Sequence, residues 1–93
     1  MIAGAREDDQ TQYEIEIRPR AVKDMKGLPR TDALRILDRI DRLRKNLEGD
    51  VKRLTQSTSE FRLRVGDYRV LFDVEGQVVV VRRVRHRREA YTR

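Results

Sequence analysis

The sequence predicts an α+β fold in which an antiparallel sheet is packed on one face by an N-terminal helical hairpin. Alternating apolar residues, the period of a half-buried strand, occur near the start of the chain and again from residue 61 onward. Between these segments, apolar residues recur at intervals of three and four, which is typical of amphipathic helices. Short turns that contain glycine separate the later strands, as antiparallel hairpins require.

The chain is predicted to begin with a tail, a strand and a short helix. Residues 1–12 are polar and show no periodicity, so we expect a mobile tail in front of one domain over residues 13–93. The alternation over residues 13–17 predicts a strand with one face inward. Pro19 suits the first turn of a helix, and Gly27 is expected to end that helix in the left-handed conformation.

A second, longer helix is expected to start at Thr31 or Asp32, either of which can cap it, and to end at Gly49. Its apolar face consists of Ile36, Ile40, Leu43 and Leu47. The opposite face alternates acidic and basic residues at intervals of four, and we interpret it as a solvated surface. Residues 51–54 are expected to form a short strand or an extended link.

The later strands carry a predicted row of arginines. Gly66-Asp67 and Glu75-Gly76 are each expected to form a two-residue turn. Arg64 then faces Arg69, and Arg69 faces Arg82, on one face of three neighbouring strands. Opposed like charges destabilise a sheet by about 0.2–1 kcal/mol each, and an anionic ligand reverses that effect. We therefore favour an anion site over the alternative, a solvated face whose side chains splay apart.

Composition restricts the classes of function. The chain has 93 residues, of which 41% are charged, and a net charge of +6, which favours a polyanionic partner such as nucleic acid or an acidic protein. It has no cysteine and one histidine, so no disulfide, metal site or metal cofactor is expected. No apolar run is long enough for a membrane span or a signal peptide, and a reducing, cytoplasmic location is expected.

A dense basic segment follows Val81 and ends near Tyr91. It contains His86, whose imidazole can exchange protons near neutral pH. Tyr91 can stack on a base or donate to an oxyanion. The alternative is a basic tail that is only solvated, with a histidine that has no chemical role.

Three stretches of the chain resemble the RelE/ParE superfamily of bacterial toxins, most closely its RelE branch. They are YEIEIRPRAVKDMKGLP, the hairpin FRLRVGDYRVLF and the C-terminal VVVVRRVRHRREAY, and the likeness runs from Tyr13 to the end of the chain. The resemblance implies a RelE-like fold and a ribosome-dependent endoribonuclease that cuts messenger RNA in the decoding site. It also implies a cognate antitoxin that covers the basic face; whether the chain forms homo-oligomers stays open.

The resemblance also implies functional residues. The catalytic set that it implies is Arg62, Arg64, Arg69, Arg87 and Tyr91. Arg85 or Arg88 could replace Arg87, because the C-terminal match needs a gap. RelE has lysines where this chain has Arg62 and Arg64, and arginine stays protonated. We therefore interpret both as phosphate clamps and His86 as a candidate acid or base. The further residues expected to bind RNA are Lys52, Arg82, Arg85 and Arg88.

The expected reaction needs no metal: the 2′-hydroxyl of the RNA attacks the adjacent phosphorus, and arginines stabilise the charge that develops. Two alternatives remain. One is a ParE-like inhibitor of DNA gyrase, and the other is a non-catalytic module that binds RNA or an antitoxin.

Overall fold

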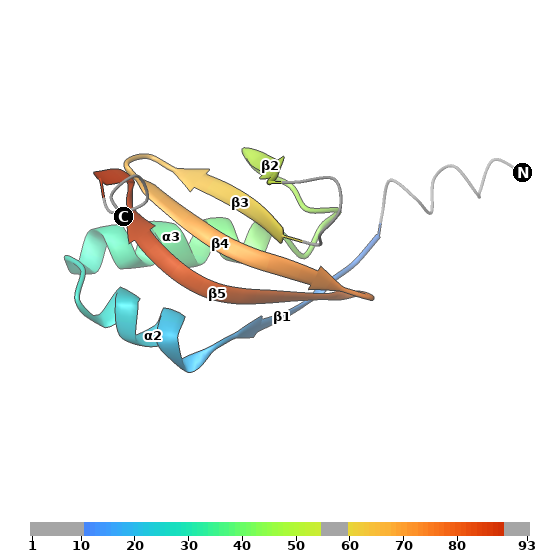
Figure 1. Ribbon diagram of the computed structural model, residues 1–93, viewed down its shortest axis with the longest axis horizontal. Helices are drawn as coiled ribbons and strands as arrows, with labels where there is room; N and C mark the ends of the chain where they lie inside the picture. The colour runs from blue at the N-terminus through green and yellow to red at the C-terminus, as the bar shows by residue number, and fades with distance from the viewer. Residues whose placement is uncertain (1–10, 55–59, 89–93) are drawn as a thin grey trace, which may run out of the picture.

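The computed structural model describes residues 11–54 and 60–88, and Figure 1 shows the order of the elements. They are β1 (Glu14–Ile17), α2 (Pro19–Lys26), α3 (Arg30–Arg42), β2 (Val51–Arg53), β3 (Glu60–Val65), β4 (Tyr68–Glu75) and β5 (Val78–His86). The predicted α+β class is confirmed, with a strand and two helices before the remaining strands. Within the described ranges, no helix is both long enough and apolar enough to span a membrane.

The five strands form one sheet in the order β1-β5-β4-β3-β2. All neighbours are antiparallel except β1 and β5, which pair in parallel, so the sheet is mostly antiparallel as predicted and differs from the prediction at this edge. The cause is that β5 inserts between β1 and β4 instead of lying at the edge. The backbone amide of Arg18 donates to the carbonyl of Val81 at 2.9 Å, which extends the contact to the end of β1.

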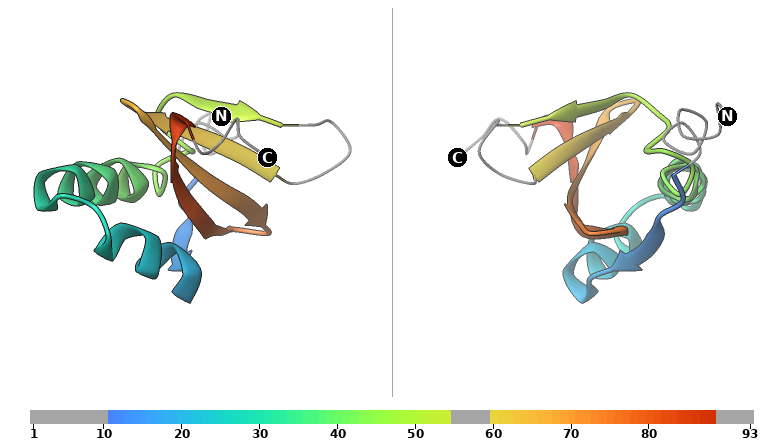
Figure 2. Two further views of the ribbon diagram at one scale, coloured as in Figure 1. Left: turned by 60° about the vertical axis from the view of Figure 1, so that its left-hand side comes forward. Right: turned by 90° about the vertical axis from the view of Figure 1, so that its right-hand side faces the viewer.

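The hydrophobic core lies between α3 and one face of the sheet, and Figure 2 shows α3 beside that face. From the helix, Ile36 and Ile40 are buried, because they share one face of α3. The sheet residues of this core are Leu63, Val65, Val70, Phe72, Val79, Val81 and Val84. α2 lies near β5 and buries Ala21 and Met25 in the same core.

The helix ends differ from the prediction in three places. Pro19 does open α2, but Gly27 ends it with a φ of −87° instead of a left-handed one. α3 begins directly after Pro29, and no side chain caps it. α3 ends at Arg42, well before Gly49, and the left-handed residues that follow are Asn46 and Leu47, with φ of 54° and 56°.

The predicted tail includes two described residues, and both contact the chain after α3. The backbone amide of Asn46 donates to the carbonyl of Thr11 at 2.8 Å, and Gln12 forms an isolated bridge with Lys45. Residues 1–10 lie outside the described residues.

The register of β5 differs from the prediction. Gly66 and Asp67 form the expected turn, with Val65 opposite Tyr68. The second turn lies one residue later than expected, because Glu75 pairs with Val78. A bulge follows: Phe72 pairs with Val81 and Leu71 with Arg83, which leaves Arg82 as the extra residue. The predicted pairing of Arg69 with Arg82 is therefore wrong, and Arg69 pairs with Arg85.

Candidate functional site

Three arginines lie side by side across the centre of the sheet. Arg64 on β3 pairs with Arg69 on β4, and Arg69 pairs with Arg85 on β5. Since side chains alternate along a strand and the flanking Leu63, Val65, Val70 and Val84 are buried in the core, these arginines point to the opposite face. We call Arg64, Arg69 and Arg85 the arginine row. Two of its three members are those predicted, and Arg85 takes the place assigned to Arg82.

Two more cations extend the row toward the edge of the sheet. Arg62 lies two residues before Arg64 on β3, and it pairs directly with Lys52 on β2. Arg62 lies between Phe61 and Leu63, which face the core, and Lys52 lies opposite Arg62, so both share the face of the row. Residues 51–54, for which a strand and an extended link were both expected, therefore include a strand that adds Lys52 to this face.

Arg69 is the fixed member of the row. Only 6% of the residue is exposed. Its Nη1 donates to the carbonyl oxygens of Gly66 and Tyr68 at 3.1 and 3.0 Å, so the β3–β4 turn holds it through neutral backbone groups. These bonds orient the guanidinium without neutralising it, and arginine does not lose its proton. A buried, oriented positive charge at the centre of the row is suited to hold an anion.

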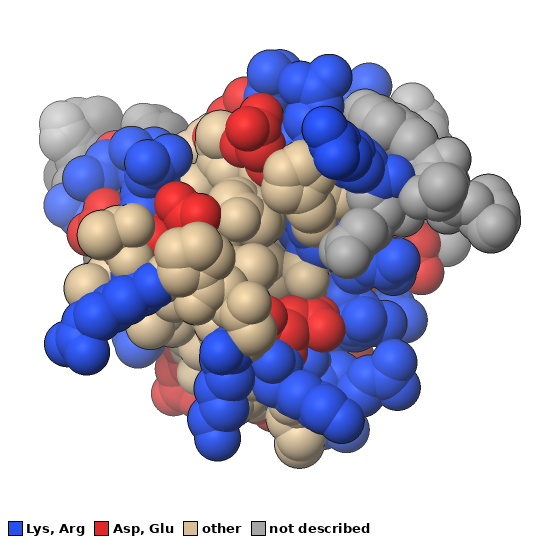
Figure 3. Space-filling model, turned by 90° about the vertical axis from the view of Figure 1, so that its left-hand side faces the viewer, with Lys and Arg blue, Asp and Glu red and all other residues tan. Residues whose placement is uncertain are grey.

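The β3–β4 turn also holds the end of β5. The backbone amide of Arg87 donates to the carbonyl of Asp67 at 2.6 Å, and Nη1 of Arg87 lies 3.8 Å from Oδ1 of Asp67. Arg87 therefore lies at the end of the sheet where the turn closes. Figure 3 shows this end of the molecule, where Lys and Arg side chains lie mostly at the margins and a few Asp and Glu side chains lie among the other residues between them. Tyr91 lies outside the described residues.

His86 is on the other face of the sheet from the arginine row. It pairs with Tyr68, and the two rings meet edge to face with centroids 5.3 Å apart. The hydroxyl of Tyr68 donates to Oδ2 of Asp32 at 3.0 Å. Burial and the nearby Asp32 carboxylate raise the pKa of Tyr68 above its ordinary value. His86 also accepts a hydrogen bond at Nδ1 from the amide of Arg88, at 3.2 Å, so it is held away from the row.

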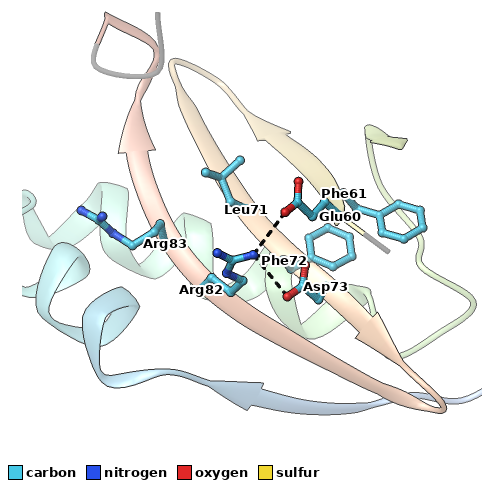
Figure 4. Close-up of a pocket in the computed structure, with 7 residues that line it drawn as sticks. All are labelled: Glu60, Phe61, Leu71, Phe72, Asp73, Arg82 and Arg83. Carbon is cyan, nitrogen blue, oxygen red and sulfur yellow. Dashed lines mark hydrogen bonds and ion pairs between the residues drawn. The ribbon is translucent and has the colours of Figure 1, made fainter. Parts of the chain in front are cut away.

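Arg82 and Arg83 are engaged by acidic side chains. Nη1 of Arg82 lies 3.5 Å from Glu60 and 3.4 Å from Asp73. These residues line a cavity of about 120 Å³, and Figure 4 shows Arg82 pointing toward both carboxylates. Arg83 donates from Nε and Nη2 to Asp24 on α2 at 2.8 and 3.2 Å. Arg82, predicted as a member of the row, is thus outside it both by register and by its partners.

Asp24 is a residue that the sequence analysis missed. Besides Arg83, it accepts a hydrogen bond from the backbone amide of Val84 at 2.9 Å, on the part of β5 that β1 does not reach. Burial raises the pKa of Asp24, but the hydrogen bonds from Arg83 and Val84 and the charges of Arg83 and Arg85 outweigh it, so the pKa is lowered overall. Asp24 therefore fixes α2 to β5 next to Arg85.

The described residues contain no group of three or more His, Cys, Asp or Glu side chains that could hold a metal ion. The chemistry that this face offers is the binding of anions by oriented guanidinium groups, which match the oxygens of a phosphate.

Comparison with known proteins decides the family. The ParE toxin of the type II toxin–antitoxin system parDE is the family that matches, over residues 15–91. The chain belongs to this toxin family. Because the match covers both the sheet and the helices, the resemblance to the RelE/ParE superfamily is confirmed.

The relatives of this toxin include proteins of Methanocaldococcus jannaschii. This chain is 30% identical over 86 residues to the protein named RelE1, and the match covers 86% of this chain and 96% of the relative. It is 33% identical over 75 residues to toxin RelE3, which covers 75% of this chain and 85% of the relative. The solved RelB–RelE antitoxin–toxin complex of Methanococcus jannaschii has a chain that is 31% identical, with a TM-score of 0.70 over 82% of this chain and 94% of that chain.

Proposed function

We propose that this toxin is an mRNA endoribonuclease that acts on messenger RNA held in the ribosome. The observation that supports it most is the arginine row with the buried, oriented Arg69 at its centre. A sheet that only needed to fold gains nothing from cations placed directly opposite one another. A phosphodiester bound across the row offsets this repulsion, because its oxygens accept from several guanidinium groups at once.

The reaction that fits this face is an internal transfer of the phosphoryl group. The 2′-oxygen of the RNA bonds to the adjacent phosphorus while the bond from phosphorus to the 5′-oxygen breaks. The 2′-hydroxyl loses its proton and the departing 5′-oxygen gains one, which leaves a 2′,3′-cyclic phosphate and a free 5′-hydroxyl. Arg64, Arg69 and Arg85 stabilise the extra negative charge on the phosphorus oxygens, and this electrostatic effect needs no metal.

The remaining cations bind and orient the strand. Arg62 and Lys52 extend the positive face beyond Arg64, and Arg87 lies by the β3–β4 turn at the other end. We assign Tyr91 the role of stacking on a base near the cut, as the family resemblance implies, and Arg88 a contact with the RNA backbone. His86 faces Tyr68. We therefore attribute the larger part of catalysis to the positioning of positive charge, and not to proton exchange by His86.

This division of labour explains a dependence on the ribosome. Among the described residues, this face supplies charge but no group fixed for proton transfer, and such a face relies on a substrate already held in the reactive geometry. The decoding site holds the message in this way, so the toxin acts there, in the cytoplasm.

The partner that we propose is a cognate antitoxin, because the relative from Methanococcus jannaschii was solved as an antitoxin–toxin complex. An apolar groove of about 370 Å³ lies between α2 and α3, lined by residues that include Val22, Met25, Leu28 and Leu37. Val22 and Leu37 are 38% and 39% exposed, and the basic Lys26 and Arg30 also line the groove. This groove fits one apolar face of an antitoxin helix with acidic flanks.

The deciding experiment maps RNA ends after brief expression of the toxin and of Arg69→Ala in cells. New 5′ ends at defined positions within reading frames, present for the parent and missing for Arg69→Ala, support the proposal. Purified toxin added to programmed ribosomes and to free message then tests the dependence on the ribosome. Cleavage of free message at an equal rate would refute that dependence.

The family match favours a second candidate, inhibition of DNA gyrase, because the matching family is the ParE toxin family. A supercoiling assay with purified gyrase separates the two functions. Inhibition of supercoiling without new RNA ends would replace the ribonuclease with a gyrase inhibitor. Absence of both activities, with antitoxin binding retained, would indicate the non-catalytic module.

A further inference from the structure

A second group of arginines surrounds a shallow depression away from the arginine row. Its lining consists of Arg18, Arg20, Arg82 and Arg83, and its volume is about 310 Å³. Arg18 follows β1, Arg20 lies in the first turn of α2, and the other two lie on β5. Two segments that are far apart in the sequence therefore bring guanidinium groups to one place.

The bulge in β5 explains why two consecutive residues line the same depression. In a regular strand, neighbouring side chains point to opposite faces. Arg82 is the extra residue of the bulge, so the alternation is interrupted between Val81 and Arg83. The hydrogen bond from the amide of Arg18 to the carbonyl of Val81 holds the end of β1 beside this point. The bulge thus brings Arg82 and Arg83 together in the lining of the depression, while Nη1 of Arg82 stays 3.4–3.5 Å from Asp73 and Glu60.

The four guanidinium groups differ in how firmly they are held. Arg83 is fixed by two short bonds to Asp24. Arg82 lies 3.4–3.5 Å from its carboxylates, and Arg18 pairs with Glu16 on the exposed surface, where such pairs contribute little. Within the described ranges, Arg20 forms no ion pair and no side-chain hydrogen bond. One fixed cation and three that can move suit a phosphate that arrives from solution.

The depression is continuous with the candidate cleavage site. Arg83 pairs with Leu71 on the face of the row, and it is two residues from Arg85. Arg82 and Arg83 also line the cavity next to Asp73, which opens on the same face (Figure 4). Basic side chains thus extend from the row along β5 and over its edge to α2.

We propose that this depression binds a backbone phosphate of the same RNA strand, several nucleotides away from the bond that is cut. The inference rests on the proposed ribonuclease function and adds a second contact to it. The ligand is a phosphodiester of single-stranded RNA, bound without regard to base, because guanidinium contacts to phosphate carry no sequence information.

The test measures binding of RNA that cannot be cleaved. The probes are a 2′-O-methyl trinucleotide, which is long enough for the row alone, and a 2′-O-methyl strand of about 12 nucleotides. The variant is Arg18→Gln with Arg20→Gln. The matched control is Arg39→Gln with Arg42→Gln, which removes two exposed, paired arginines from the outer face of α3. Dissociation constants are measured for both probes at several salt concentrations.

The variant is expected to bind the longer strand about fivefold to tenfold more weakly than the parent. The slope of log K against log salt is expected to fall by about 0.7 for each phosphate that the variant no longer binds. The dissociation constant of the control for the longer strand, and that of the variant for the trinucleotide, should differ from the values of the parent by less than about twofold. An equal loss for variant and control, or an equal loss for both probes, would overturn the proposal. The probes are not cleaved, so these binding measurements do not depend on ribonuclease activity. If the toxin failed to cut message, the proposed ribonuclease function would be refuted, but the binding result could still be interpreted.

Discussion

Arg69 and Arg85 lie directly opposite each other on β4 and β5, because the bulge at Arg82 shifts the register by one residue. Without this shift Arg69 would face a different residue of β5, and Arg85 would leave the row. The bulge therefore contributes to two sites: it completes the arginine row, and it places Arg82 in the lining of the depression by β1.

Replacement of Arg69 by alanine is expected to lower the rate of cleavage on the ribosome by about 10²–10³-fold, because it removes one oriented donor to the developing charge. The loss of two hydrogen bonds to carbonyl oxygens is partly offset by relief of repulsion in the row, so the free energy of unfolding should fall by less than about 2 kcal/mol. Single-turnover cleavage and urea unfolding measure the two effects. An unchanged cleavage rate would remove Arg69 from the site.

His86→Gln is expected to change the cleavage rate by less than about threefold, far below the 10²–10⁴-fold effect of losing a general acid or base. The reason is that the imidazole faces Tyr68 on the side of the sheet away from the row. The pH dependence of single-turnover cleavage by the parent and by this variant checks the prediction. A large loss, with the profile moved by the substitution, would return His86 to the role that the sequence analysis assigned to it.

Asp24→Asn is expected to destabilise the protein by about 1.5–3 kcal/mol at neutral pH, because Asp24 accepts hydrogen bonds from Arg83 and Val84. The lowered pKa of Asp24 stabilises the folded state above its unfolded pKa, and this stabilisation is lost as the pH falls through the folded pKa. The variant should therefore lose less stability than the parent between about pH 4 and more acidic conditions. Thermal unfolding at several pH values measures the stability of both proteins. If the stability of the variant and of the parent changed equally with pH, the prediction would be contradicted.

Leu37→Glu is expected to weaken binding of the antitoxin by at least about tenfold, because it places a charge in the apolar groove between α2 and α3. Leu34→Glu is the matched control, since Leu34 is 53% exposed and does not line the groove. Calorimetric titration with the purified antitoxin compares them. Equal affinities for both variants would place the antitoxin elsewhere on the surface.

The sequence predicted the strands and their inward faces because the period of two is a local property, and the pairing of Arg64 with Arg69 follows from the turn at Gly66. The second turn was placed one residue too early, although Gly76, with a φ of 63°, stands at the first central position just as Gly66 does. The same rule, applied consistently, predicts that turn. No local pattern marked the bulge at Arg82, because a strand with two consecutive arginines is equally compatible with a regular or a bulged register.

The parallel pairing of β1 with β5 and the role of Asp24 could not be predicted from local sequence patterns, for another reason. Both depend on which segments meet after distant parts of the chain have come together. Asp24 has the pattern of an ordinary polar position on an exposed helix, and only the uncovered edge of β5 beyond β1 gives it partners. Catalytic assignments at Tyr91 depend on residues outside the described ranges and stay predictions.

The central position of β5 sets the order in which the toxin can become active. Every other element precedes β5 in the chain, yet Arg85 sits next to Arg69 only after β5 has entered between β1 and β4. In a growing polypeptide that has not yet emerged as far as residue 85, the sheet lacks its central strand and the arginine row is not assembled. Under the proposed function, the ribosome that synthesises this protein is therefore not a target of the new chain until that last strand is in place.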